Sequence, residues 1–236
     1  MNVLLLIGGS RGLGRALVDI FHKESWSVLE FSRTGPVPFN HTLDLNHPFE
    51  SLNSFTHVTK SLDQQNINRV VMILNSAAIL PIRNVAKLTP QEIQSSVNIN
   101  ITSAILLCQA YVSLFRNFAR PKMLINIGSG AAHRGFPGWS LYCAGKAAME
   151  SFFRALHEEE NFEPHPFTVF TYDPHVMDTQ MQAEIRQSSE TEFPLVEHFR
   201  KLHSLGQLTP PEKVAIHLYA LIEQPDIFKN RFDYNE

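Results

Sequence analysis

The stretch VLLLIGGSRGLGRAL, residues 3–17, decides the fold, because a strand, a glycine loop and a helix follow one another in it without interruption. Residues 3–7 are apolar on both faces, which is typical of a buried parallel strand. Gly8, Gly12 and Gly14 follow with the spacing G-x-x-x-G-x-G, and helical periodicity begins there. Glycines at such a junction let the backbone approach a pyrophosphate at the helix N-terminus. The stretch predicts a dinucleotide site, with a simple tight turn as the alternative, since the spacing differs from G-x-G-x-x-G.

The rest of the chain repeats this alternation of strand and helix. Strand-like apolar runs recur at residues 27–32, 69–74, 122–128 and 167–172, with a short final one near 228–233. Helical periodicity covers about 12–24, 49–65, 89–118, 142–160 and 210–224, with looser helical pieces between 178 and 204. This order predicts an α/β fold, a Rossmann-type doubly wound parallel β-sheet flanked by helices. No Pro/Gly/Ser-rich linker divides the 236 residues, so we expect a single domain over 1–236.

Composition narrows the function classes. The chain is 44% hydrophobic and 18% charged with a formal net charge of −3, so it lacks a polybasic surface for nucleic acid or a membrane. The first apolar run is only five residues long without a basic flank, and no stretch approaches the ~18 apolar residues of a membrane span. Only Cys108 and Cys143 are present, which favours a reducing, cytoplasmic location. The eleven histidines show no metal-ligand spacing, so we expect no metal.

The end of the second strand bears on the choice of cofactor. An acidic residue there would bind a ribose 2′-hydroxyl, whereas basic residues accommodate a 2′-phosphate. The chain reads EFSRTG at 30–35, and strand alternation leaves Ser32 and Arg33 at the strand end, joined by Arg11 of the glycine loop. Two arginines can clamp one phosphate, which favours NADP(H) over NAD, unless either arginine is merely solvated.

A phenol and an amine stand four residues apart in LYCAGKAAMESF, residues 141–152. This spacing puts Tyr142 and Lys146 one helical turn apart, and a nearby ammonium would lower the pKa of the phenol. The pair predicts a proton donor, although Tyr and Lys at this spacing also occur on solvated helix faces.

Taken together, these motifs resemble the short-chain dehydrogenase/reductase family over nearly the full length of the chain. The resemblance rests on IGGSRGLG (7–14), LDLN (43–46) with Asp44, NSAA (75–78), NITS (100–103), INIGSG (125–130) and YCAGK (142–146), in the family's order. The interval from Ser129 to Tyr142, 142 − 129 = 13 residues, also matches the family's interval.

The resemblance implies a set of catalytic residues for hydride transfer to a ketone. Tyr142 would donate the proton, and Lys146 would lower the pKa of the phenol and hold the nicotinamide ribose. Ser129 would hydrogen-bond the substrate carbonyl, and Asn100 would hold a water that links Lys146 to solvent. The residues implied to bind NADP(H) are Gly8, Ser10, Arg11, Gly12, Leu13, Gly14, Arg33, Asp44, Asn75, Tyr142, Lys146, Pro174, Val176 and Thr179.

The chain also departs from the family pattern. Ile7 replaces a threonine of the glycine loop, and Ser76 and Ala78 alter the family's NNAG. The family's Pro-Gly step is Pro174-His175, so His175 either narrows or enters the pocket, or points to solvent.

Within the family, three segments resemble sepiapterin reductases and bacterial benzil reductases: DTQMQAEIR (178–186), HSLGQLTPPEKVAIHLYALIE (203–223) and RFDYNE (231–236). By that match Asp233 would anchor a pterin amino group, or else it is solvated. The implied substrate residues are Ser129, Tyr142, His175 and Asp233, and Phe136, Trp139 and Phe193 either wall the substrate pocket or belong to the core.

The leading interpretation is an NADPH-dependent carbonyl reductase for a small ketone or vicinal dicarbonyl. The alternatives are a non-catalytic NADP(H)-sensing regulator and an NAD-dependent alcohol dehydrogenase. By family resemblance the helices at 89–118 and 142–160 would pair with a second copy, which predicts a homodimer or homotetramer.

Overall fold

A computed structural model describes residues 1–75, 81–224 and 229–235. Its sheet has seven parallel strands in the order β3-β2-β1-β4-β5-β6-β7. The strands are β1 Asn2–Ile7, β2 Ser27–Ser32, β3 Asn40–Thr42, β4 Arg69–Leu74, β5 Lys122–Ile127, β6 Thr168–Asp173 and β7 Arg231–Asp233. The five long strands lie within a residue of their predicted positions, which confirms the doubly wound parallel sheet. The sequence missed β3, because three residues are too few to show periodicity.

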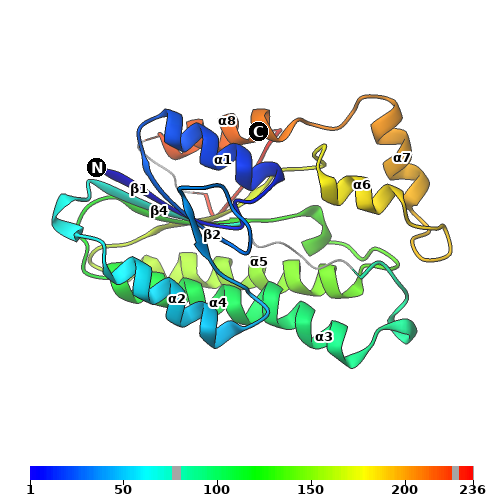
Figure 1. The fold of residues 1–236 in the computed structure, drawn as a ribbon, viewed down its shortest axis with the longest axis horizontal. Coiled ribbons are helices and arrows are strands. Elements are labelled where there is room, and N and C mark those ends of the chain that lie inside the picture. The colour runs from blue at the N-terminus through cyan, green and yellow to red at the C-terminus, as the bar shows by residue number, and fades with distance from the viewer. Residues whose placement is uncertain (76–80, 225–228, 236) are drawn as a thin grey trace.

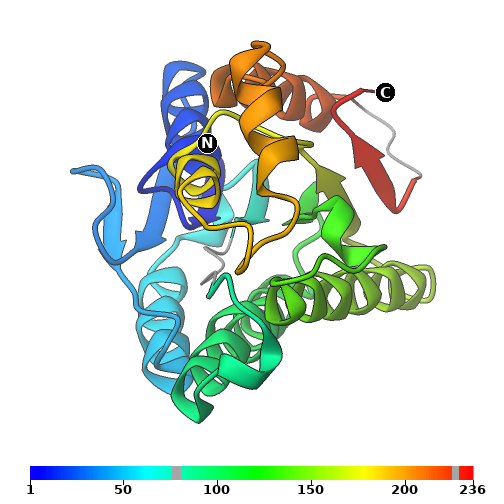
Figure 2. The same ribbon diagram turned by 90° about the vertical axis from the view of Figure 1, so that its right-hand side faces the viewer.

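Helices cover both faces of the sheet (Figure 1). On one face lie α1 Gly12–Lys23 and α8 Pro211–Ile222, and on the other lie α2 Pro48–Lys60, α4 Ser103–Phe115 and α5 Ser140–Glu160. Three shorter helices, α3 Pro90–Val97, α6 Gln180–Arg186 and α7 Val196–Ser204, gather at the end of the molecule that faces the viewer in Figure 2. Short 3₁₀ turns lie at η1 Gln64–Asn66, η2 Val85–Lys87 and η4 Gly130–Ala132.

Two predicted helices differ from the structure. The helix predicted at 49–65 ends at Lys60, where the chain turns into η1. The helix predicted at 89–118 is divided by η3, a π-helical segment at Asn98–Thr102, into α3 and α4. Because a π-helical segment inserts one residue into the hydrogen-bonding pattern, periodicity alone does not reveal it.

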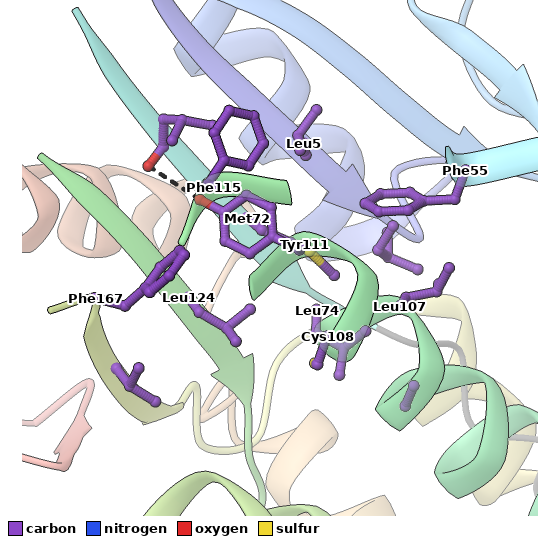
Figure 3. Close-up of a cluster of buried hydrophobic side chains, with 14 of the residues drawn as sticks. Leu5, Phe55, Met72, Leu74, Leu107, Cys108, Tyr111, Phe115, Leu124 and Phe167 are labelled. Atoms are coloured by element: carbon purple, nitrogen blue, oxygen red, sulfur yellow. Dashed lines mark hydrogen bonds between the residues drawn. The ribbon is translucent and has the colours of Figure 1, made fainter. Parts of the chain in front are cut away.

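The core follows from the alternation of side chains along each buried strand. Leu5 of β1 faces α2, α4 and α5, whereas Leu4 and Leu6 face α1 and α8. Figure 3 shows part of the first of these layers, with Tyr111 of α4 among its buried side chains. Its hydroxyl lies 3.2 Å from the Val70 carbonyl oxygen and 3.0 Å from that of Met123, so the polar atom is satisfied inside an apolar layer.

One helical stretch among the described residues, Pro90–Phe115, is long and apolar enough to cross a membrane by length and composition. The sequence-based expectation that no segment approaches this composition is therefore wrong for this stretch. Its apolarity has a local explanation, because Leu107, Tyr111 and Phe115 pack in the core. Only 33% of its most apolar window is buried, and Ile105, Val112 and Leu114 of α4 pack against the core but stay partly exposed within one chain.

Candidate active site

A cavity of about 960 Å³ lies where the strands β1, β2, β4, β5 and β6 end, which is the place where open parallel α/β sheets bind ligands. Its size falls in the upper part of the roughly 300–1,000 Å³ range of small-molecule sites. The predicted cofactor residues that line it are Gly8, Ser10, Arg11, Gly12, Leu13, Arg33, Asp44, Asn75, Tyr142, Lys146, Pro174, Val176 and Thr179. Of the predicted substrate residues, Ser129, Tyr142 and His175 line it as well. Gly14, Asn100 and Asp233 lie outside the lining.

The glycine loop owes its shape to close backbone approach. Gly8 and Gly12 have positive φ angles of 89° and 53°, which favour glycine. A Cβ at Gly14 would lie 1.9 Å from the Gly8 carbonyl oxygen, so α1 can begin directly over the end of β1 only with glycine there. The Asn75 amide donates to the same oxygen at 2.8 Å and braces the loop from the end of β4. The loop leaves the open backbone and helix N-terminus that a dinucleotide pyrophosphate requires, so the residues fit this cofactor class.

Glu30 of β2 is a supporting residue that the sequence analysis did not assign. It is fully buried, and its carboxylate accepts hydrogen bonds from the Gly9 backbone N–H and the Asn40 amide, both at 2.7 Å. A Cβ at Gly9 would lie 2.3 Å from the Glu30 Cγ, so the side chain fills the space beneath the loop. A carboxylate within an apolar strand was the available signal, because buried charges need partners.

The two arginines of the predicted phosphate clamp both line the cavity. Arg11 lies 3.6 Å from the carboxylate of Glu184 on α6, and both side chains are about half exposed. Such an exposed pair contributes little to stability, so Arg11 can exchange it for an anionic ligand at small cost.

The predicted catalytic side chains converge from two elements. Ser129 precedes η4, and its hydroxyl accepts a hydrogen bond from the Ala131 backbone N–H at 3.1 Å. Tyr142 and Lys146 lie in the first turns of α5, and the Lys146 Nζ lies 5.9 Å from the centroid of the Tyr142 ring. The Lys146 ammonium donates a 2.7 Å hydrogen bond to the carbonyl of Ile127, at the end of β5.

The electrostatics of this pair differ from the sequence-based expectation. Desolvation raises the pKa of the Tyr142 phenol above its usual value, while a hydrogen bond with Ser129 acts in the opposite direction. Desolvation also lowers the pKa of Lys146 to about 8, against the opposing charges of Asp173 and Glu150. The expected lowering of the phenol pKa by Lys146 is therefore wrong for this arrangement, because burial dominates and the ammonium is directed at the Ile127 carbonyl.

Asn100 lies in the π-helical segment η3, a feature that is often found at functional sites. The side chain is 5% exposed and donates to the Ser96 hydroxyl at 3.2 Å. A Cβ at Gly145 would lie 3.0 Å from the Asn100 Cβ, so this glycine lets α5 pack closely on η3. Asn100 is thus held against the helical turn that carries Lys146, behind the cavity wall.

His175 follows Pro174 at the end of β6 with a φ angle of +55°, in the left-handed region that favours glycine. This conformation explains why the family pattern has glycine there. The imidazole is about half exposed and lines the cavity, with its Nε2 3.1 Å from the Asp233 carboxylate and 3.2 Å from the Asn235 amide. The structure therefore favours the prediction that His175 narrows the cavity over the alternative that its side chain points freely into solvent. Asp233 reaches the cavity only through His175.

Aromatic side chains form the wall opposite the glycine loop. Trp139 stacks on Phe193 at a centroid distance of 4.6 Å and meets the Tyr142 ring edge-on at 5.5 Å. Phe136, Trp139 and Phe199 line the cavity, whereas Phe193 is fully buried behind Trp139. Phe193 therefore belongs to the core of this wall rather than to its surface. The sequence analysis missed the lining residues that α6 and α7 supply, because their placement depends on how these helices fold back.

Comparison with known proteins assigns the class. The model of the short chain dehydrogenase family matches residues 2–190, and the chain belongs to that family. Benzil reductase ((S)-benzoin forming) of Bacillus subtilis (strain 168) is 32% identical over 229 residues, covering 95% of this chain and 94% of that protein. Sepiapterin reductase of Xenopus laevis is 28% identical over 204 residues, covering 75% of this chain and 74% of that protein.

The fold is also that of solved structures. A short chain dehydrogenase of Shigella flexneri 2a, solved in complex with NADP, superposes with a TM-score of 0.77 at 20% sequence identity. The alignment covers 100% of this chain and 97% of that chain. The protein is thus an oxidoreductase of the short-chain dehydrogenase class with relatives that include benzil and sepiapterin reductases.

We expect Gly14→Ala to lower the free energy of unfolding by roughly 1–3 kcal/mol, because the added methyl meets the fixed Gly8 carbonyl oxygen. Alanine usually stabilises a helix relative to glycine, so the sign of the effect is diagnostic. Urea unfolding measures it. Gly135→Ala is the control, since a Cβ there meets nothing within 4 Å. Equal stability of Gly14→Ala and the wild type would contradict the close approach.

Proposed function

We propose that the protein is an NADPH-dependent carbonyl reductase that acts on a small ketone or vicinal dicarbonyl. The observation that carries the proposal is one cavity with the glycine loop at one side and Ser129, Tyr142 and Lys146 at the other. A dinucleotide on the loop would extend toward these side chains, so its reactive ring and a substrate carbonyl would meet beside the phenol.

Bound NADPH would supply the hydride that reduces the carbonyl carbon. The Tyr142 phenol would donate its proton to the developing alkoxide, and the Ser129 hydroxyl would hold the same oxygen. A raised phenol pKa keeps Tyr142 protonated, as a donor must be, before the substrate binds. Lys146, with a pKa of about 8, is mostly protonated at neutral pH but gives up its proton more readily than an exposed lysine, so it would help to return one to the phenolate. Asn100 lies against the same helical turn and would hold a water through which this proton exchanges with solvent.

The preference for NADP(H) over NAD rests on the end of β2. The Glu30 carboxylate, the one acidic group within that strand, is fully buried beneath the glycine loop and does not line the cavity where a ribose hydroxyl would lie. Arg33 and Arg11 line the cavity near that end and would accommodate a 2′-phosphate. This arrangement disfavours the alternative of an NAD-dependent alcohol dehydrogenase.

The substrate class is supported by the wall and by the relatives. Phe136, Trp139 and Phe199 offer flat apolar surface to an aryl group or a fused ring. Benzil and sepiapterin, which the relatives' names give as substrates, both combine a planar ring system with adjacent oxygen functions. We propose a substrate of that type, with His175 at the edge of its site.

The proposed reductase is tested by NADPH absorbance decay with benzil, sepiapterin, 1-phenyl-1,2-propanedione and simple aldehydes. We expect Tyr142→Phe to keep NADPH binding and to lose at least about 100-fold in kcat, because the proton donor is gone. Tyr219→Phe on α8, on the other side of the sheet, is the control and keeps activity. Wild-type NADPH binding without turnover on any compound would favour the sensing regulator, and undiminished turnover in Tyr142→Phe would overturn the assignment of the donor.

The cofactor preference makes a separate prediction. Replacing Arg11 and Arg33 by alanine should raise the dissociation constant of NADPH by roughly 100-fold, because two charge-assisted contacts are lost, with a change of less than about 3-fold for NADH. Fluorescence titration measures both constants. Arg15→Ala is the matched control, since Arg15 is also half exposed but bonds to Asp19 on its own helix. An equal loss for both nucleotides would refute the phosphate clamp.

We also propose a homo-oligomer that pairs α4 and α5 with those of a second copy, because the apolar side chains of Ile105, Val112 and Leu114 on α4 stay partly exposed in one chain. Light scattering on a sizing column should then give a dimer or tetramer mass. Val112→Glu on α4 should shift the mass toward the monomer, while Leu205→Glu, an exposed apolar site after α7, should not. A monomeric wild type at micromolar concentration would contradict the pairing.

A further inference from the structure

Arg231 of β7 joins two carboxylates that come from different elements. Its Nη1 lies 2.8 Å from the Oε2 of Glu150 on α5, and its Nη2 lies 2.7 Å from the Oδ2 of Asp173 at the end of β6. The two carboxylates are largely buried, with 12% and 8% of their side chains exposed, and the guanidinium is 28% exposed. A buried carboxylate is costly without a partner, so these three side chains hold one another in place.

This group of charges lies directly behind the catalytic side chains. Glu150 is one helical turn beyond Lys146 on α5, and Asp173 lines the cavity. Gly128, the residue before Ser129, touches the ion pair: a Cβ there would lie 3.5 Å from Glu150 Oε2 and 3.6 Å from Arg231 Nη1. The arginine therefore supports the ends of both β5 and β6.

Asp173, which is held by Arg231, also holds the loop that carries His175. Its second carboxylate oxygen, Oδ1, accepts from the His175 backbone N–H at 3.0 Å, and its carbonyl accepts from the Tyr234 N–H at 3.0 Å. The His175 imidazole contacts Asp233, two residues beyond Arg231. Asp173 of β6 thus fixes the backbone of the unusual left-handed residue, and Asp233 of β7 contacts its side chain.

The two carboxylates act on the proton-handling residues. Asp173 raises the pKa of both Tyr142 and Lys146, and Glu150 raises the pKa of Lys146. Arg231 lies at hydrogen-bonding distance from both carboxylates, so its positive charge offsets their negative charge.

The other ionisable group near Glu150 is His133. Its Nε2 lies 3.9 Å from Glu150 Oε1, and its side chain is half exposed. Among the described residues, Asp173 on β6 and Glu150 on α5 raise the pKa of Lys146 by their charge. Arg231 on β7 and His133 contact these carboxylates, and the Tyr142 ring lies 5.9 Å from the Lys146 Nζ.

We propose that Arg231 is a positioning residue of the active site, which orients Glu150 and Asp173 and sets the charge that Lys146 and Tyr142 experience. The inference rests on the proposed roles of Lys146 and Tyr142 in proton transfer. It assigns a function in catalysis to a strand that contributes no lining residue to the cavity.

The first test measures the titration of Lys146 by NMR, in protein without cofactor or substrate. The Cε chemical shift of Lys146 is followed in protein with labelled lysines, and the signal that is lost in Lys146→Arg identifies it. Arg231→Met removes a positive charge and leaves two carboxylates uncompensated, so the Lys146 midpoint should rise by roughly one pH unit from about 8. Arg231→Lys keeps the charge and should leave the midpoint close to the wild-type value, even where it lowers thermal stability.

Arg116→Met is the matched control. Arg116 bonds to the Glu160 carboxylate at 2.8 and 2.9 Å with 27% exposure, and it lowers the pKa of the buried Lys122, which is also about 8. This variant should therefore raise the titration midpoint of Lys122 and leave that of Lys146 unchanged. Arg231→Met should raise the midpoint of Lys146 and leave that of Lys122 unchanged. A loss of stability in Arg231→Met with an unmoved Lys146 midpoint would overturn the proposal.

Glu150→Gln provides a test with the opposite sign, and it serves if Arg231→Met does not fold. It removes a negative charge and leaves Arg231 with one carboxylate, so the Lys146 midpoint should fall. An unchanged midpoint would also contradict the inference.

The pH profile of kcat/KM for ketone reduction should shift in the same direction as the Lys146 midpoint in each variant. If the wild type shows no turnover but the variants show the expected Lys146 midpoints, the proposed function would be contradicted and the electrostatic role of Arg231 would still stand. If the wild type turns over substrate and all variants have superimposable pH profiles, the proposed function would be supported and the electrostatic role of Arg231 overturned.

Discussion

The turn from β1 into α1 is the constraint on which the rest of the site depends. The helix can begin over the end of the strand only because Gly14 has no Cβ to strike the Gly8 carbonyl oxygen. That oxygen is bonded by Asn75 from β4, and the next residue, Gly9, is bonded by the buried Glu30 from β2. Three neighbouring strands thus hold one loop, and the loop in turn leaves open the helix end and the cavity beside it.

The opposite half of the cavity is organised around α5. This helix carries Tyr142 and Lys146 toward the cavity in its first turns, and one turn later it carries Glu150 toward β7. Its close packing on the π-helical segment η3 depends on Gly145, which meets Asn100. A single helix therefore links the proton-handling side chains to the buried Asn100 amide at one flank and to the ion pairs of Arg231 at the other.

The departure from the family pattern at His175 belongs to a connected region at the ends of β6 and β7. His175 takes the place of glycine in a left-handed conformation, and it is stabilised by Asp173 through the backbone and by Asp233 through the side chain. A non-glycine residue in this conformation is strained and persists only when its surroundings fix it. The ends of β6 and β7 supply those surroundings, and the ion pair of Arg231 with Asp173 connects them.

The sequence by itself determined the order of strands and helices and the glycine loop, because these signals are local: periodicity and glycine spacing. The Ser129, Tyr142 and Lys146 set was predicted from the resemblance to the family's ordered motifs, and all three residues line one cavity. The sequence did not determine β3, which is too short for periodicity, or the π-helical interruption near Asn100. The tertiary structure alone decided that Glu30 lies under the glycine loop, that Asp233 stands behind His175, and that burial raises rather than lowers the pKa of Tyr142. It also decided the pairing of Arg231 with residues 81 and 58 positions away. Burial and ion pairing depend on which distant segments are brought together in the folded chain, and no local pattern contains that information.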